Sequence, residues 1–418
     1  MTLKDLSPLA QAHAWPTLTT SPTRRQALRA AAAAALAAAW GQGRAQTAGP
    51  STSPPAVMTR FAATAREASV LRIDSSTDTA LFAPAIRDFQ RLYPSVTVQY
   101  TDRQSLDMHA RALALAGAQG AASRDVAEAP DLLISSSPDL QTQLANDGHA
   151  LSHQSPQTRE LPEGAHWRRE AFTLGADAVV MAYNPRLLTP ALAPRTRGQL
   201  LALLRQSGSP LLGRIGTYDA LRSGLGYLLA TQDSRFDSTA SVLLAAMGAS
   251  KARLGDHIEP LLDRLEQGEL ALVYNVPASY ALARMAAGSS LRVIVPEDYT
   301  LLTTRVALIP ASARHPELAR PFLDYLLSPQ GQAVLARDTR LLPVRQAVAA
   351  ARDGRALALP GQPSPLPAVA GSAPGGSAWR LLSPGLGLLV YLDPLKRQRF
   401  LQAWATSLGA SAAGPGAG

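Results

Sequence analysis

Three short loops rich in hydroxyl side chains are the segments of this sequence best suited to hold a small molecule. They are residues 74–78 (DSSTD), 135–137 (SSS) and 217–224 (TYDALRSG). Each loop follows a short apolar run typical of a strand and leads into a helical pattern. At a helix start, unpaired backbone N–H groups and the positive end of the helix dipole favour negative charge. The loops therefore predict a site for an anion, although helix capping alone would use the same residues.

Arg222 strengthens the prediction of an anion site. A guanidinium group can hold a carboxylate or a phosphate through two parallel hydrogen bonds. Arg222 stands one residue before Ser223, which is the expected N-cap of the next helix. In the alternative interpretation, Ser223 only caps that helix while Arg222 pairs with Asp219 at the surface.

Catalytic and metal-binding patterns are missing from the sequence. There is no cysteine, no Gly-x-Ser-x-Gly elbow and no phosphate-cradling Walker loop. His149 and His153 have the spacing of zinc ligands on a helix, but Gly148 precedes them and no glutamate follows His149. Residues 224–226 (GLG) lack the third glycine of a dinucleotide fingerprint. The sequence therefore predicts a protein that is not an enzyme and has no metal or cofactor.

Short apolar runs alternate with longer runs of helical spacing from Ser69 onward, which predicts an α/β fold. In open sheets of this class, ligands bind beyond the carboxyl ends of strands, where the three loops lie. The expected strands are residues 70–73, 96–100, 131–134, 177–183, 214–216, 270–273, 291–295 and 306–309. The expected helices begin near Leu81 and Pro138 and at 197–206, 223–231, 258–267, 316–327 and 329–337.

The N-terminal residues 1–45 resemble a twin-arginine signal peptide. Arg24 and Arg25 precede an apolar run at 30–40 that is too short to span a bilayer, and small residues stand near the expected cleavage after Ala45. The protein is therefore expected in the periplasm.

Three further segments are assigned from composition. Residues 46–67 are interpreted as a flexible tether, 346–378 as a Pro/Gly-rich linker, and 379–418 as a C-terminal helical segment and tail. The formal charge is +9, but most arginines are spread singly along the chain, and the densest cluster of cations is residues 396–399 (KRQR). A solvated basic surface is favoured over nucleic-acid binding, which needs clustered cations.

The order of these motifs resembles an extracytoplasmic solute-binding protein of an ABC importer. The resemblance lies in the group with ferric-ion and sugar-phosphate binders, and the chain is also similar to phosphoglycerate transport regulatory binding proteins. It is carried by residues 71–78, 131–150, 216–233, 271–284 and 295–333. It implies a two-lobed, type II periplasmic-binding-protein fold, with a mixed sheet flanked by helices in each lobe.

The same resemblance implies how the chain divides. Lobe one would hold residues 68–172 and 296–345, and lobe two residues 173–295. Strands would cross the hinge near 172–176 and 295–298, and closure of the hinge would enclose the solute.

The resemblance also implies the ligand-binding residues, which are Ser75, Ser76, Thr77, Ser135, Ser136, Tyr218, Arg222, Ser223, Tyr274 and Asn275. Ferric-binding relatives use two adjacent tyrosines, whereas here Tyr274 is followed by Asn275 and the next tyrosine is Tyr280. This departure favours an organic anion over Fe(III), which remains an alternative. Asp298 and Tyr299 either reach the cleft or shape the hinge.

The predicted function is therefore a periplasmic, monomeric substrate-binding component of an ABC transporter. It would capture a small phosphorylated or carboxylated solute by hinge closure and deliver it to an ABC permease. Two alternatives stay open, namely ferric-ion transport and ligand sensing with a membrane sensor kinase of a two-component system.

Overall fold

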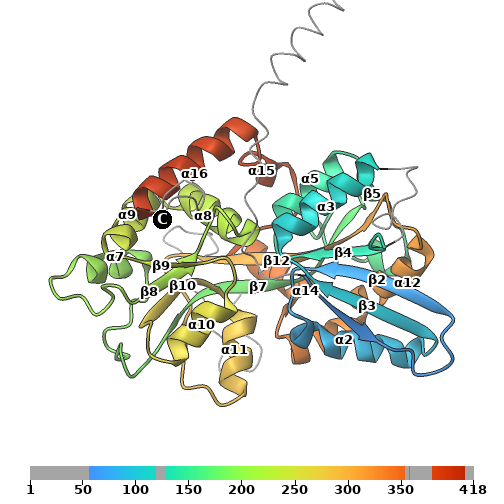
Figure 1. Ribbon diagram of the computed structural model, residues 1–418, viewed down its shortest axis with the longest axis horizontal. Coiled ribbons are helices and arrows are strands. Elements are labelled where there is room, and N and C mark those ends of the chain that lie inside the picture. The colour runs from blue at the N-terminus through green and yellow to red at the C-terminus, as the bar shows by residue number, and fades with distance from the viewer. Residues whose placement is uncertain (1–55, 119–127, 354–356, 358–378, 410–418) are drawn as a thin grey trace, which may run out of the picture. The chain divides into compact units, whose positions relative to one another are not determined.

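The computed structural model describes residues 56–118, 128–353, 357 and 379–409 (Figure 1). The expected signal peptide, the first part of the tether and most of the linker lie outside these residues. In the described part of the chain, no helix is long and apolar enough to cross a membrane.

A single mixed sheet organises the fold. Along its main path the strand order is β1-β3-β2-β4-β12-β7-β10-β8-β9. These strands are β1 (Val57–Phe61), β2 (Ser69–Ser75), β3 (Val96–Asp102), β4 (Leu132–Ser135), β7 (Ala171–Tyr183), β8 (Ile215–Tyr218), β9 (Arg253–Gly255), β10 (Leu272–Pro277) and β12 (Thr300–Pro310). β2 pairs in parallel with β3 and β4, and β8 pairs in parallel with β9 and β10. The parallel strands therefore form two groups.

The two long strands β7 and β12 join these groups. They pair with each other in antiparallel fashion, while β12 also pairs with β4 and β7 with β10. Figure 1 shows both strands running between two masses of helices and strands. Five short strands pair with β7 or β12. They are β5 (Ala150–Leu151), β6 (His166–Trp167), β11 (Arg292–Ile294), β13 (Leu342–Pro343) and β14 (Trp379–Leu381).

Lobe one is the name used here for β1 to β4 and the helices that cover them. These helices are α2 (Thr79–Leu92), α3 (Ser105–Gly117), α5 (Pro138–Asn146), α6 (Pro156–Arg159), α12 (Pro316–Leu327), α13 (Pro329–Val334) and the π-helical turn η1 (Leu335–Thr339). In α2, the buried residues Phe82, Ile86 and Phe89 recur on one face. Phe89 meets Phe322 of α12 edge to face at 4.8 Å, which closes the core of this lobe.

Lobe two is built on β8 to β11. Its helices are α7 (Arg197–Arg205), α8 (Gly224–Phe236), α9 (Ala240–Ala249), α10 (Glu259–Glu266) and α11 (Ala278–Ala286). Its core combines leucines of α8 and α10 with valines of β7 and β10. The expected α/β fold with two lobes joined by crossing strands is confirmed, whereas the exact division of the chain between lobes stays a prediction.

Two segments differ from the sequence-based expectation. Residues 57–61, assigned to the tether, form β1 and pair with β3. Residues 346–353, assigned to the linker, lie in helix α14 (Val344–Asp353), whose buried face is Val344, Ala347 and Ala350. An edge strand with exposed side chains and a helix that buries alanines show little contrast in hydrophobicity, so neither stood out in the sequence.

The C-terminal helix α16 (Pro394–Leu408) packs on α8 and α9 of lobe two, after the short helix α15 (Leu386–Leu389). Trp404 is buried there, and Phe400 meets the Tyr227 ring edge to face at 5.6 Å. Contact with α9 is close at Gly248, where a Cβ atom would lie 2.0 Å from the backbone oxygen of Ser407.

Gly248→Val is therefore expected to push α16 off α9 and to lower the melting temperature by several degrees, because overpacking costs about 1–3 kcal/mol. Thermal unfolding followed by circular dichroism measures this. Gly117→Val is the control, since a Cβ at Gly117 meets nothing within 4 Å. An unchanged melting temperature for Gly248→Val would contradict the tight docking of α16.

Candidate solute-binding cleft

A cleft of about 440 Å³ opens between the two lobes, and segments that begin helices line it. Lobe one supplies the starts of α2, α3 and α5, and lobe two supplies the starts of α8 and α10. Its lining residues are Ser76, Asp78, Asp102, Arg103, Gln104, Ser105, Ser136, Tyr218, Ser223, Leu225, Asp256, His257, Ile258, Glu259, Tyr280 and Arg305. Loops far apart in the sequence thus meet because parallel strands end at one edge of each lobe.

Ser76 and Ser136 are the two predicted serines that come together in the cleft. Their hydroxyl oxygens lie 3.1 Å apart, and the Ser136 backbone N–H donates to Ser76 Oγ at 2.9 Å. Ser75 and Ser135 point inward instead, because each accepts the N–H two residues on, from Thr77 and from Ser137 at 3.1 Å. Those two serines are fully buried in the sheet edge, and they and Thr77 are absent from the cleft lining.

The loop between β8 and α8 contributes Tyr218 and Ser223 to the cleft. Ser223 Oγ also accepts the Gly226 N–H at 3.1 Å and so caps α8. Arg222 lies 4.0 Å from Asp219, has an exposed side-chain fraction of 51% and does not line the cleft. This placement matches the alternative in which Arg222 pairs with Asp219 at the surface.

Tyr274 and Asn275 lie at a second cavity of about 550 Å³, which α16 covers with Phe400 and Trp404. Both side chains donate to Asp233, the Tyr274 hydroxyl at 2.9 Å and the Asn275 amide at 2.9 Å. Arg197 Nε in turn donates to the Tyr274 hydroxyl at 2.7 Å. These two predicted site residues therefore line a different cavity from Ser76 and Ser136, and Tyr218 borders both cavities.

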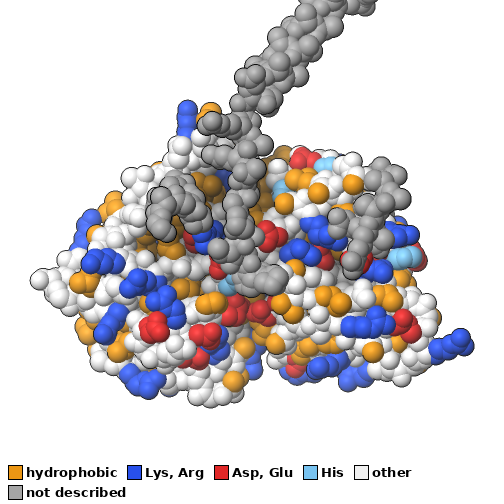
Figure 2. All heavy atoms as spheres, viewed as in Figure 1, with side chains coloured by type: hydrophobic (Ala, Val, Ile, Leu, Met, Phe, Trp, Pro, Cys, Tyr) orange, Lys and Arg blue, Asp and Glu red, His pale blue; other side chains and the backbone are white. Residues whose placement is uncertain are grey.

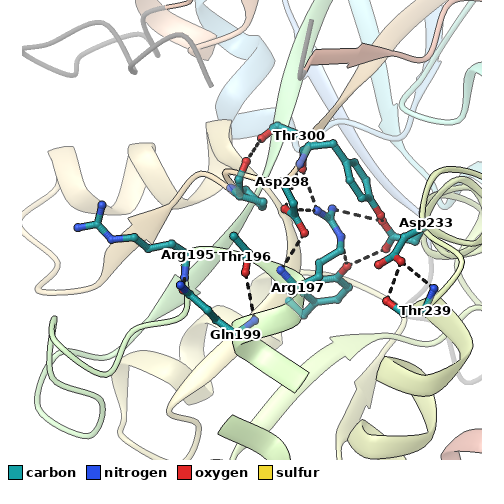
Figure 3. Close-up of polar contacts among 12 residues, drawn as sticks. Arg195, Thr196, Arg197, Gln199, Asp233, Thr239, Asp298 and Thr300 are labelled. Carbon is teal, nitrogen blue, oxygen red and sulfur yellow. Dashed lines mark hydrogen bonds and ion pairs between the residues drawn. The ribbon is translucent and has the colours of Figure 1, made fainter. Parts of the chain in front are cut away.

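The surrounding polar network is shown in Figure 3. Arg197 pairs with Asp298 at 3.0 Å, and the Tyr299 hydroxyl donates to Asp233 at 2.7 Å. Asp298 and Tyr299 thus hold the start of β12 against α7 and α8. Neither residue lines the cleft between the lobes.

The two tyrosines considered for Fe(III) are also separated. Tyr280 lines the cleft, whereas Tyr274 lines the cavity beneath α16. Among the residues that the structure describes, no group of three His, Cys, Asp or Glu side chains is arranged to hold a metal ion.

Arg305 is a cleft residue that the sequence analysis missed. It lies within β12, is only 2% exposed, and its Nη2 atom is 3.7 Å from Asp177 Oδ2. Its Nε and Nη2 atoms have no hydrogen-bond partner in the described structure. A buried guanidinium with unused N–H donors is costly, and an anionic guest would satisfy it. The available sequence signal was an arginine inside the otherwise uncharged run 300–310.

Three carboxyl groups also meet in the cleft, from Asp78 and Asp102 of lobe one and Glu259 of lobe two. Burial raises the pKa of Asp102 to about 7, and the negative charge of Asp78 adds to the rise. Burial likewise raises the pKa of Glu259 to about 9, again with a contribution from Asp78. Asp102 and Glu259 therefore keep their protons at pH values at which a carboxyl group in water loses its proton.

These shifts predict a pH dependence of stability. A carboxyl whose pKa is higher in the folded than in the unfolded protein stabilises the fold fully below about pH 4, and the gain is lost as the pH rises through about 7 and then about 9. The melting temperature of the empty protein is therefore expected to fall between pH 6 and pH 9.5, as thermal scans would show. Glu259→Gln should flatten this fall, while Glu269→Gln, an exposed carboxyl paired with Arg264, should not. Identical profiles for wild type and Glu259→Gln would contradict the shift.

Comparison with known proteins gives one family. The model of the bacterial extracellular solute-binding proteins matches residues 71–338. The chain is 29% identical to the substrate-binding protein of an ABC transporter from Agrobacterium tumefaciens, with a TM-score of 0.72 over 84% of this chain and 98% of that chain. No curated protein matches it.

Two more distant structures share the fold. Iron-bound HitA from Pseudomonas aeruginosa is 16% identical, with a TM-score of 0.58 over 81% of this chain and 99% of that chain. The periplasmic binding protein AfuA from Actinobacillus pleuropneumoniae, solved with fructose-6-phosphate, is 16% identical, with a TM-score of 0.58 over 82% and 99%.

The family match covers more than half of the chain, and both the fold and the cleft between lobes agree with it. Proteins of this family act outside the cytoplasm, bind small solutes for a membrane permease and are not enzymes. The chain therefore belongs to the bacterial extracellular solute-binding proteins, the solute-binding components of ABC transporters.

Proposed function

We propose that this protein captures a small solute bearing a phosphate or carboxylate group and delivers it to an ABC permease. The observation that carries the proposal is Arg305, a buried cleft residue whose Nε and Nη2 atoms have no hydrogen-bond partner in the described structure. Charge-assisted hydrogen bonds of this kind are among the strongest that a protein makes to an anion.

The serine pair supports the same assignment. Thr303 and Arg305 lie two residues apart on β12 and so on one face of the strand. The Thr303 hydroxyl donates to the Ser136 carbonyl at 3.1 Å, which holds the Ser136 loop beside that face. Ser76 and Ser136 can therefore donate hydroxyl groups to a solute that Arg305 binds, and the nearby helix starts add positive potential.

Direct contacts between the lobes support binding by hinge closure. The Gln104 side chain of lobe one donates to the Asp256 carbonyl of lobe two at 2.7 Å and lies 3.2 Å from His257 Nδ1. Closure around a solute requires contacts that the open form lacks, and these residues line the cleft. β7 and β12 are the strands about which the lobes would turn.

Thermal-shift screening tests the proposal. The panel contains sugar phosphates, phosphoglycerates, di- and tricarboxylates and Fe(III)-citrate. A bound compound at 100 times its dissociation constant stabilises the protein by about 2.7 kcal/mol. We expect stabilisation by at least one organic phosphate or carboxylate. Stabilisation by ferric citrate alone, with none from iron-free citrate, would overturn the choice of an organic anion.

The export route belongs to the same proposal. Arg24 and Arg25 in the N-terminal segment direct the protein through the twin-arginine pathway. Replacing both with lysine is expected to retain the protein in the cytoplasm, as cell fractionation would show. Normal export of that double variant would contradict this route.

A further inference from the structure

The carboxyl cluster of Asp78, Asp102 and Glu259 has no basic partner among the residues that the structure describes. Arg103 and Arg284 line the same surfaces as the cluster, but each pairs with an acidic residue outside it. Arg103 Nε lies 3.2 Å from Asp74, and Arg284 lies 2.7 Å from both Asp263 and Glu266. No arginine or lysine within the described ranges forms an ion pair with any of the three carboxyl groups. A bound cation would favour the ionised forms of these carboxyl groups.

The position of the carboxyl cluster also favours a role in binding the solute. All three carboxyl groups line the cleft, and all three also line an open groove that passes β1 and α11. They therefore stand where the cleft opens outward. Figure 2 shows acidic side chains gathered in the crease between the two lobes on that face.

Arg305 provides an independent sign that a ligand belongs in this cleft. Its buried Nε and Nη2 atoms have no hydrogen-bond partner, since even Asp177 lies 3.7 Å from Nη2, and an anionic group would accept from them. Arg305 and the three carboxyl groups line the same cleft, and the positive charge of Arg305 opposes the rise in the pKa of Asp102. A solute anchored on Arg305 would extend toward the carboxyl cluster within the same cleft.

We propose that the solute carries a protonated amine in addition to its phosphate or carboxylate, and that Asp78, Asp102 and Glu259 bind the ammonium group. This inference rests on the proposed function above. An ammonium group has three N–H donors and can bond to several carboxylate oxygens at once. Because Glu259 belongs to lobe two and the two aspartates to lobe one, the ammonium group also links the lobes in the closed form.

The proposal predicts that binding is selective between solutes that differ only in an amine. Suitable pairs are O-phospho-L-serine with 3-phosphoglycerate, O-phosphoethanolamine with 2-hydroxyethyl phosphate, and 4-aminobutyrate with 4-hydroxybutyrate. In each pair a hydroxyl group replaces the amine. Isothermal titration calorimetry at pH 8 is expected to show that the amine member of at least one pair binds about tenfold more tightly or better, which corresponds to about 1.4 kcal/mol.

Two variants locate the selectivity. Glu259→Gln keeps the shape of the side chain but cannot ionise to pair with an ammonium group, and is expected to reduce the preference to within about twofold. Glu269→Gln removes a carboxyl group that pairs with Arg264 at 2.8 Å outside the cleft, and is expected to keep the full preference. A preference that survives Glu259→Gln unchanged would overturn the assignment of Glu259.

The outcomes separate this inference from the proposed function. Equal binding of both members of every pair, or tighter binding of the hydroxyl member, overturns the ammonium site and leaves the anion site standing. Binding of no organic phosphate or carboxylate overturns both. If Mg²⁺ or Ca²⁺ alone raised the melting temperature of the wild type as much as an amine solute does, and this rise were lost in Glu259→Gln, the carboxyl cluster would be a metal site. That result would overturn the ammonium proposal.

Discussion

Replacing Arg305 with lysine is expected to weaken binding of the solute by roughly 10- to 150-fold. Lysine keeps the positive charge but loses the planar fork of N–H donors, and a hydrogen bond to a charged group contributes about 1.5–3 kcal/mol. Calorimetric titration with the panel compound that gives the largest thermal shift measures the loss. An affinity within twofold of wild type would remove Arg305 from the site.

Arg197 offers a matched control, because it is also an arginine with 2% exposure and a close aspartate. Its guanidinium belongs to the network beneath α16, with Tyr274 and the Tyr299 carbonyl as hydrogen-bond acceptors. Arg197→Lys is therefore expected to lower the melting temperature while changing affinity little. Equal losses of affinity in the two variants would mean that Arg305 acts only through the stability of the fold.

Gly224→Val is expected to weaken binding by roughly 5- to 150-fold by obstructing closure. Gly224 begins α8, and a Cβ there would lie 2.5 Å from Ser105 Oγ and 3.2 Å from Leu140 and Ser137 of lobe one. Overpacking of this kind costs about 1–3 kcal/mol, and it arises only when the lobes meet. Calorimetry measures the affinity, and small-angle scattering shows whether the solute still makes the protein more compact.

Gly117→Val controls for the added side chain, because its Cβ meets nothing within 4 Å. That variant is expected to bind and to compact like wild type. If Gly224→Val also compacted normally and bound with wild-type affinity, the contact between α8 and lobe one would not be part of closure.

The convergence of loops on one cleft could be predicted from the sequence. Strand and helix signals placed the residues 74–78, 135–137 and 217–224 after strands and before helices, and each loop supplies at least one residue to the cleft. Parallel pairing of β2 with β4 then places Ser76 and Ser136 side by side. The pattern of strands and turns was therefore sufficient to locate this edge of the sheet.

The choice of residues within each loop could not be predicted. Ser75 and Ser76 are chemically equivalent in sequence, and only the turn that buries Ser75 Oγ under the Thr77 N–H separates them. Tyr274 and Asn275 end a strand as expected, but their side chains bond to Asp233. That partner lies in α8, some 40 residues earlier in the chain, and no local pattern indicates it.

The charged residues of the cleft escaped the sequence analysis for a similar reason. Asp78, Asp102 and Glu259 come from three separate elements and form no motif. Arg305 was hidden because buried polar residues interrupt the apolar pattern of β12, so the expected strand began only at Val306. A charged residue inside such a long buried strand indicates a functional site, because a buried charge is costly unless it is paired.

A crystal structure grown with the compound that gives the largest shift in the screening panel tests the central claim most directly. The claim is that helix starts of both lobes and Arg305 surround one solute. The expected result is an anionic group within hydrogen-bond distance of Arg305 Nε or Nη2 and of Ser76 or Ser136, with both lobes in contact with the solute. A solute bound instead in the cavity beneath α16, beside Tyr274 and Phe400, would contradict the account.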